Sequence, residues 1–166
     1  MIHTIEDFYS ESEKWISLFN AFAEKHSLIG ETVVDHICYK CGSRDSFEST
    51  RALFETESHY LHQSIISGRR IAYVKLKKDI PTVLGFLSFL ELSDQKPDGS
   101  QKESFDHIEV FPSAYSYDEM IARLGKNEQI VKVERPHHTT HDIDIGGFFF
   151  RCTKEPLIQK IIRSEM

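Results

Sequence analysis

The chain has 166 residues and a formal net charge of −6 at pH 7, because 20 lysines and arginines stand against 26 aspartates and glutamates. This length fits one domain, or two small modules that share a core. The acidic balance argues against binding to a nucleic-acid backbone, which asks for a basic surface. No apolar run approaches the roughly 18 residues that span a bilayer. We therefore expect a protein that binds neither nucleic acid nor membrane.

The N-terminus and the cysteines bear on the compartment. The first residues, Met-Ile-His-Thr-Ile-Glu-Asp, lack the basic and then apolar start of a secretion signal. Three cysteines, an odd number, are typical of reduced thiols rather than of a disulfide framework. Two of them form a C-x-x-C motif at residues 38–41, but its position inside a predicted strand favours buried thiols over a redox or zinc site. We expect a cytoplasmic protein.

The first half of the chain predicts a helix, a strand, a second helix and two further strands. Apolar residues recur at helical spacing over residues 5–27, and Thr4, three residues before Asp7, is a helix-start signal. Residues 32–40 are rich in β-branched and aromatic side chains, as strands are. The later elements of this half are a helix over residues 45–60 and strands over residues 70–76 and 86–92.

The second half repeats this order after a polar stretch with Pro97 and Gly99, which predicts a linker. Gly125 is the expected stop of a short helix in this half. The predicted elements are a strand over residues 105–111, a helix over 117–124, strands over 130–134, 140–145 and 148–152, and a closing helix over 157–163.

The repeated order is matched by repeated residues. The Asp-His-Ile of residues 35–37 recurs at residues 106–108, and a glycine followed by phenylalanine opens an apolar strand at both Gly85 and Gly147. Such echoes, at matching points of a repeated element order, predict duplicated modules. The expected organisation is an N-terminal helical segment over residues 1–30, a first module over 31–93, a linker over 94–104, and a second module with a C-terminal helix over 105–166.

Alternation along a strand decides which side chains share a face. If Ile37 and Ile108 pack against helices, then His36 and His107 face the opposite, concave side of the sheet. Glu91 can face that side as well. Two imidazoles and one carboxylate from three strands can hold a divalent metal and leave coordination positions open for water or substrate. The alternative is a pair of strand histidines bonded to the backbone and a solvated glutamate; both interpretations stay open.

Two further residues are candidates for a catalytic or substrate-binding role in the same cavity. Glu109 follows His107 by two residues on the same predicted face, so it is a candidate general base or fourth metal ligand. Its alternative role is that of a surface partner for a lysine. Arg69 lies in a turn before a strand and could hold an anionic substrate oxygen bidentately. An ordinary solvated turn is the alternative there.

A histidine cluster, Pro-His-His-Thr-Thr-His at residues 136–141, is the most conspicuous motif. On a helix, His137 and His141 would form a zinc-binding pair, but the proline and the β-branched threonines favour an extended segment. Four residues along a strand span about 13 Å, too far for one ion. We expect at most one of these histidines to reach the cavity, and we select His141, which lies within the predicted strand, as a substrate contact.

Four segments carry a resemblance to a known family. They are Val-Val-Asp-His-Ile at residues 33–37, Gly-Arg-Arg-Ile at 68–71, Phe-Leu-Glu-Leu at 89–92 and Phe-Asp-His-Ile-Glu-Val at 105–110. In this order and context, the chain resembles the YecM-like family over about residues 10–160. That family looks like a branch of the vicinal oxygen chelate superfamily, which includes glyoxalase I, extradiol dioxygenases and bleomycin-resistance proteins.

The resemblance implies both a fold and a cofactor. The implied fold is α+β, with two βαβββ modules that form a curved mixed sheet around a cavity, and an N-terminal helical extension. The implied cofactor is a divalent metal ion (Zn, Ni, Mn or Fe), held by the first and last strands of each module. Carried over by position, its ligands are His36 and Glu91 from the first module and His107 from the second.

The fourth ligand position is where this sequence departs from the superfamily's pattern. If the two Gly-Phe echoes are aligned, Thr153 corresponds to Glu91, and threonine is a poor ligand where the superfamily's enzymes usually carry a carboxylate. Water, Glu109 or Cys152 could complete the site instead. Loss of the metal is also open, because the same superfamily contains sequestering proteins without one.

The sequence therefore favours a metal-dependent enzyme that acts on a small oxygenated substrate by isomerase, lyase or dioxygenase chemistry. Its main alternative is a metal-free module that binds or sequesters a small molecule in the same cavity. A third possibility is an interaction protein whose N-terminal helix docks a partner. The identities of the substrate and metal, and the oligomeric state, are left open by the sequence.

Overall fold

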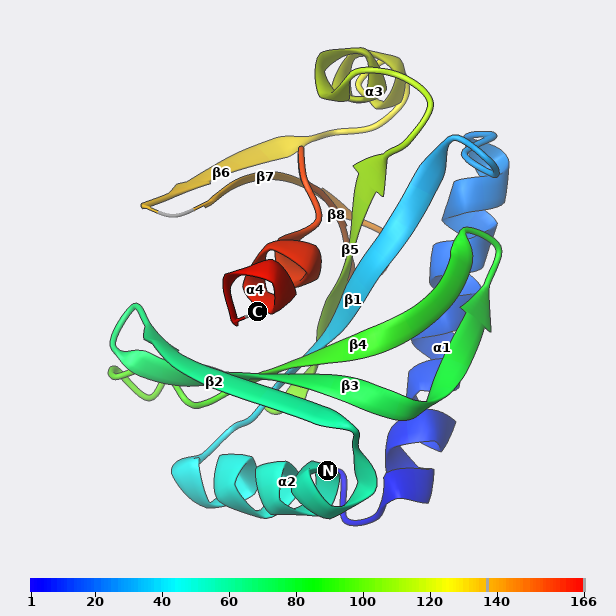
Figure 1. Cartoon of the computed structure of the whole chain (residues 1–166). Helices are drawn as coiled ribbons and strands as arrows, with labels where there is room; N and C mark the ends of the chain where they lie inside the picture. The colour runs from blue at the N-terminus through cyan, green and yellow to red at the C-terminus, as the bar shows by residue number, and fades with distance from the viewer. Residues whose placement is uncertain (137, 166) are drawn as a thin grey trace.

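Eight strands form one curved, open sheet with helices on both of its sides (Figure 1). The structure is a computed structural model that describes residues 1–136 and 138–165, with side chains up to residue 161. The elements are α1 (Ile5–Lys25), β1 (Thr32–Lys40), α2 (Arg44–Glu57), β2 (Tyr60–Ile66), β3 (Arg69–Thr82), β4 (Gly85–Ser93), β5 (Ser104–Pro112), α3 (Tyr117–Leu124), β6 (Val131–Arg135), β7 (His138–Asp144), β8 (Phe149–Cys152) and α4 (Leu157–Glu165). The strand order in the sheet is β2-β3-β4-β1-β5-β8-β7-β6.

The sheet consists of two βαβββ modules joined along their first strands. The first module runs from β1 to β4 and the second from β5 to β8. Within each module the first strand pairs in parallel with the last, and at the centre β1 pairs with β5 in the antiparallel sense. The α+β class, the paired modules, the curved mixed sheet and the N-terminal helix that the sequence predicts are thereby confirmed.

Two details of the first module differ from expectation. The second helix ends at Glu57, and Tyr60–Ile66 form β2, a strand that the sequence analysis did not predict. This strand lies at an edge of the sheet with partly exposed side chains, so its apolar residues do not alternate cleanly. Strand β3 continues to Thr82, beyond the predicted end at residue 76, so that Pro81 lies inside it. Because β2 pairs with β3 only as far as Lys75, this part of β3 is itself an edge, where proline is tolerated.

Helix α1 packs on the convex side of the sheet and contacts both modules (Figure 1). It begins at the predicted cap, Thr4. Phe8 lies 5.1 Å from Phe54 of α2 in the first module, and Phe19 lies 5.3 Å from Phe150 of β8 in the second, both measured between ring centroids. Each buried phenylalanine stabilises the fold by about 1.5–3 kcal/mol. None of the four helices in the described part of the chain has the length and apolar character needed to cross a membrane.

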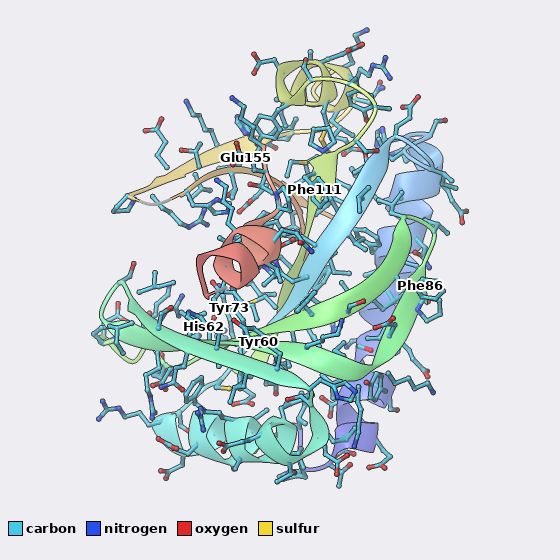
Figure 2. The ribbon with its side chains drawn as sticks, viewed as in Figure 1. Tyr60, His62, Tyr73, Phe86, Phe111 and Glu155 are labelled. Carbon is cyan, nitrogen blue, oxygen red and sulfur yellow. The ribbon has the colours of Figure 1, made fainter. Side chains whose placement is uncertain are left out.

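Helix α4 lies on the opposite, concave side, within the curve of the sheet (Figure 1). Its Ile158 is buried in a small cluster with Ile71 and Tyr73 of β3, and Figure 2 shows Tyr73 beneath this helix. The backbone N–H of Ile158 donates a hydrogen bond to Oδ2 of Asp35 in β1, at 3.3 Å. The start of α4 is therefore tied to the centre of the sheet and covers part of its concave face.

Candidate metal centre

Each Asp-His pair of the repeat lies at a β-bulge in the central ladder between β1 and β5. The ladder skips Asp35 in β1 and Asp106 in β5, so each of these aspartates is the extra residue of a bulge. A bulge re-aims the side chains that follow it, and bulges are frequent beside functional sites. As a result, Val34 packs into the core on the convex side, whereas His36, two residues later, faces the concave side together with His107.

The two aspartates hold their neighbouring histidines in the same orientation. Oδ2 of Asp35 lies 2.7 Å from Nδ1 of His36, and Oδ2 of Asp106 lies 2.7 Å from Nδ1 of His107. Because an ionised carboxylate only accepts hydrogen bonds, Nδ1 donates in both pairs and Nε2 is the nitrogen left for the cavity. Metal-binding histidines usually have such a carboxylate behind them.

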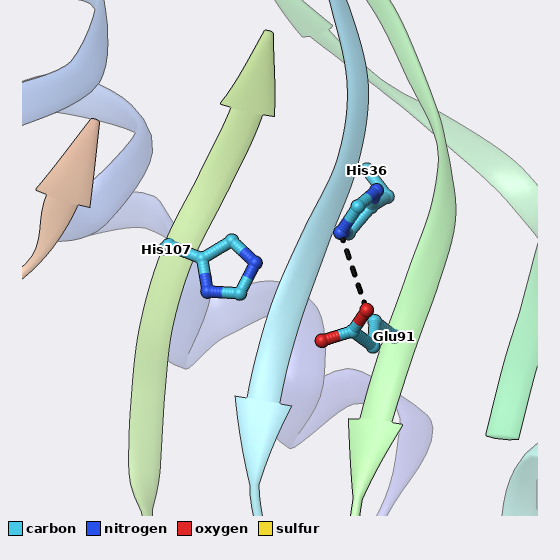
Figure 3. Close-up of side chains that lie close together, drawn as sticks. All are labelled: His36, Glu91 and His107. Carbon is cyan, nitrogen blue, oxygen red and sulfur yellow. Dashed lines mark ion pairs between the residues drawn. The ribbon is translucent and has the colours of Figure 1, made fainter. Parts of the chain in front are cut away.

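Both imidazoles and the carboxylate of Glu91 converge on one point (Figure 3). Their candidate ligand atoms all lie within 4.8 Å of one another, and Nε2 of His36 is 3.5 Å from Oε2 of Glu91. The ring centroids of His36 and His107 are 5.6 Å apart. Nε2 of His36 is buried and has no hydrogen-bond partner among the described residues. Buried polar atoms are almost always paired, so this nitrogen fits a bound cation.

The charges around His36 favour a positive charge at this point. Burial lowers the pKa of His36, but nearby carboxylates, first that of Glu109, outweigh burial and raise this pKa to about 9. Burial would raise the pKa of Glu91, but nearby positive charge, first that of the His36 imidazole, lowers it to about 2. Without metal, the cluster therefore keeps a proton on His36 and a charge on Glu91 at neutral pH. A divalent cation would take the place of that proton.

The position equivalent to Glu91 in the second module is Arg151, which corrects the alignment that selected Thr153. Glu91 lies opposite the residue two positions after His36, and Arg151 lies opposite the residue two positions after His107. The Gly-Phe echo is misleading because Gly85 is the first residue of β4, whereas its counterpart lies in the turn before β8. The hydroxyl of Thr153 instead donates to a backbone oxygen at 3.4 Å.

Arg151 brings a guanidinium to the place where a fourth ligand was expected. It donates to both carboxylate oxygens of Asp142 in β7, at 2.9 and 3.0 Å, and its Nη1 lies 3.2 Å from Nε2 of His107. Burial and this guanidinium lower the pKa of His107, so the ring is neutral and Nε2 accepts. Cys152, the neighbouring candidate, is buried in the convex core. The structure therefore offers Glu91 but no matching carboxylate from β8.

Glu109 is buried at the cluster, as the alternation predicts, and its partner there is a histidine that the sequence analysis did not select. Oε1 of Glu109 lies 2.9 Å from Nε2 of His138, and Oε2 lies 3.7 Å from Nδ1 of His36. Burial opposes a low pKa for this carboxyl, but the imidazoles of His36 and His138 lower the pKa below its usual value. Glu109 is therefore ionised at neutral pH beside the candidate ligands.

His141 does not line the cavity, contrary to expectation. In β7, His138 and Asp142 face the concave side, so the alternation turns His141 to the convex side, where its Nδ1 lies 2.6 Å from the hydroxyl of Tyr117. Asp142, the residue after His141, pairs with the buried Arg151 on the concave side. This pair fixes which face of β7 is concave, and the sequence analysis did not use it. His137, the other histidine of this cluster, lies outside the described residues.

The cluster opens into a cavity of about 190 Å³ on the concave side. Arg69 reaches the wall of this cavity, but its Nη1 donates to the side chain of Gln101 and to the backbone oxygen of Asp94. A wider surface depression of about 910 Å³, next to α2, contains none of the cluster residues. Other residues in the cavity wall are Tyr73, Glu91, His107, Glu109, Arg135 and Arg151.

Comparisons with known proteins give a family and a fold. The family described as YecM protein matches residues 5–147, and no curated protein matches the chain. A structural-genomics structure of Protein EC4020 is similar to the chain with 20% identity, 98% of this chain and 93% of that chain covered, and a TM-score of 0.74. At that identity, the likeness shows a shared fold.

Two other solved structures are more distant. A hypothetical protein from Bacillus halodurans C-125 has 15% identity and a TM-score of 0.49, with 75% of this chain and 94% of that chain covered. A mutant of 4-hydroxymandelate synthase from Streptomyces coelicolor has 10% identity and a TM-score of 0.29, with 82% of this chain and 56% of that chain covered.

Proposed function

The chain belongs to the YecM family, and from the geometry of its buried cluster we propose that it is a divalent-metal-dependent enzyme of the vicinal oxygen chelate type. The observation that carries this proposal is the convergence of His36 and Glu91 from one module with His107 from the other, within 4.8 Å. Two imidazoles and one carboxylate suit Zn, Ni, Mn or Fe, and they leave coordination positions for two oxygens of a small substrate.

The roles of the surrounding residues follow from their contacts. A bound metal ion would polarise the substrate oxygens and stabilise negative charge on them. Glu109, ionised and directed at the cluster, would accept a proton from the substrate, and His138 would hold this carboxylate in place. Asp35 and Asp106 would orient the two imidazoles. This set suits isomerase, lyase or dioxygenase chemistry.

A second candidate function is a metal-free module that binds or sequesters a small molecule. Arg151 favours it, because a guanidinium takes the place of the second module's carboxylate and lies 3.2 Å from Nε2 of His107. A fixed positive charge there opposes a cation and attracts an anionic ligand. The same cavity would then bind its ligand without chemistry.

Metal analysis of the full chain, purified without a chelator or a histidine tag, tests the two candidates. The enzyme proposal expects a stoichiometric transition metal in the wild-type protein and in His141→Ala, which removes a histidine outside the cavity. It expects loss of that metal in His107→Ala. Metal-free protein whose melting temperature is unchanged by Zn, Ni, Mn or Fe would contradict the enzyme proposal and favour the binding module.

A further inference from the structure

In the part of the chain that the structure describes, Arg135 is a guanidinium of the cavity wall without a carboxylate partner. It ends β6 directly opposite His138 of β7, and residues directly opposite each other in a sheet share a face. Its Nη1 donates to the hydroxyl of Thr140 at 2.8 Å. Among the described residues, Arg135 forms no ion pair, although its side chain is half-buried. A charge in such a place is normally paired.

Two other cations of the cavity wall, Arg151 and Lys40, have carboxylate partners, and a third, Arg69, donates to neutral groups away from the cluster. Arg151 donates to Asp142 through Nε and Nη2, and its Nη1 donates to Nε2 of His107. Lys40 lies 3.0 Å from a carboxylate oxygen of Asp106. Burial and the nearby charge of Arg151 lower the pKa of Arg135, yet an arginine stays protonated at physiological pH. Its planar fork therefore remains available to a ligand that enters the cavity.

We propose that Arg135 binds the carboxylate group of the ligand, so that the ligand is a small monocarboxylate whose remaining polar end faces His36, Glu91 and His107. A guanidinium and a carboxylate match in shape and form two parallel charge-assisted hydrogen bonds. Only the orientation toward the metal cluster rests on the proposed function; the carboxylate contact does not. A cavity of about 190 Å³ suits a compact acid, since the pockets that bind drug-sized ligands measure about 300–1,000 Å³.

A carboxylate fits this cavity better than a phosphate does. Glu91 and Glu109 line the same space, so a dianion would face two carboxylate side chains there. A monoanion balances the charge of Arg135, which has no carboxylate partner among the described residues. The charges in the cavity wall therefore favour a monocarboxylate.

The test is a titration of the ¹⁵N-labelled full chain, treated with chelator, in which backbone amide shifts report binding. The probes are lactate, glycolate and pyruvate, with lactamide as the uncharged match of lactate and inorganic phosphate as the competing anion. We expect at least one acid to shift amides of β6 and β7, and we expect lactamide to shift none of them. Arg135→Gln should weaken the acid by about 10-fold or more, the size of a charge-assisted pair.

Two further variants serve as controls. Lys132→Gln removes an exposed cation of the same strand, which is paired with Glu134, and should leave the affinity unchanged. Arg135→Lys keeps the charge but loses the fork, so it should bind with intermediate affinity. Equal binding of lactate and lactamide, tighter binding of phosphate, no binding of any acid, or full affinity in a folded Arg135→Gln would each overturn the inference. Because the protein is metal-free in this titration, failure of the metal analysis leaves the result standing.

Discussion

At the scale of single residues, one carboxylate beside each histidine decides which ring nitrogen faces the cavity. Asp35 and Asp106 accept from Nδ1 of the histidines that follow them, both at 2.7 Å. The outcome on the cavity side differs between the two: Nε2 of His36 has no hydrogen-bond partner among the described residues, whereas Nε2 of His107 faces the guanidinium of Arg151. Nε2 of His36 is therefore available to a cation, whereas Nε2 of His107 must first give up its contact with Arg151 before it can bind a cation.

The orienting role of Asp106 gives a testable consequence. Asp106→Asn keeps the size of the side chain but removes its negative charge, which makes the imidazole of His107 a weaker ligand. We expect metal affinity to fall about 10- to 100-fold, the usual effect of losing such an outer partner. Competition with a chromophoric chelator measures it. Asp98→Asn, in an exposed loop, is the control, and equal losses in the two variants would contradict the role.

At the scale of elements, the two Gly-Phe echoes have opposite environments. Phe148, in the turn before β8, is fully buried and stacks on Trp15 of α1, with 5.2 Å between ring centroids. Phe86, at the start of β4, is 70% exposed on the β3–β4 hairpin (Figure 2). The two Gly-Phe pairs thus match in residue type but not in structural position. For this reason the alignment built on them misplaced the fourth ligand position by two residues.

This difference in burial predicts a difference in stability. Phe148→Ala should lower the free energy of unfolding by about 3–5 kcal/mol, because it leaves a cavity between α1 and the sheet. Phe86→Ala should change this free energy by no more than about 0.5 kcal/mol, since it loses only exposed surface. Urea unfolding followed by circular dichroism measures both. Similar losses for the two variants would show that α1 does not pack on the second module as described.

At the scale of the whole molecule, the candidate site exists only where the two modules meet. His36 and Glu91 come from the first module and His107 from the second, and the antiparallel pairing of β1 with β5 brings them together. The core on the convex side, with α1 across both modules, packs behind this seam. A ligand at the seam therefore binds the folded chain and not a separate module.

Metal should accordingly stabilise the whole fold. By linkage, a metal at 100 times its dissociation constant adds about 2.7 kcal/mol to the free energy of unfolding. We expect one cooperative transition to shift upward with Zn, Ni, Mn or Fe in the wild-type chain and in His141→Ala. In His107→Ala the shift should vanish. A shift of full size in His107→Ala would mean that the metal binds elsewhere.

Local patterns made much of the fold and part of the site predictable. Side-chain alternation and β-branched content placed β1 at Thr32–Lys40, and apolar spacing with a glycine stop placed α3 at Tyr117–Leu124, both as observed. The repeated Asp-His-Ile predicted that His36 and His107 would face one side. These features depend on residues close together in the chain, which is why a sequence reveals them.

The sequence by itself determined the paired modules and the histidines of the candidate centre. Only the tertiary structure decided that Arg151 is the counterpart of Glu91, that His138 and not His141 faces the cavity, and that α4 covers part of the concave face. The reason is that pairing register, bulges and the length of a turn set which face a strand residue occupies, and a shift of one residue reverses it. Those quantities are fixed by contacts between segments far apart in the chain, where local spacing carries no signal.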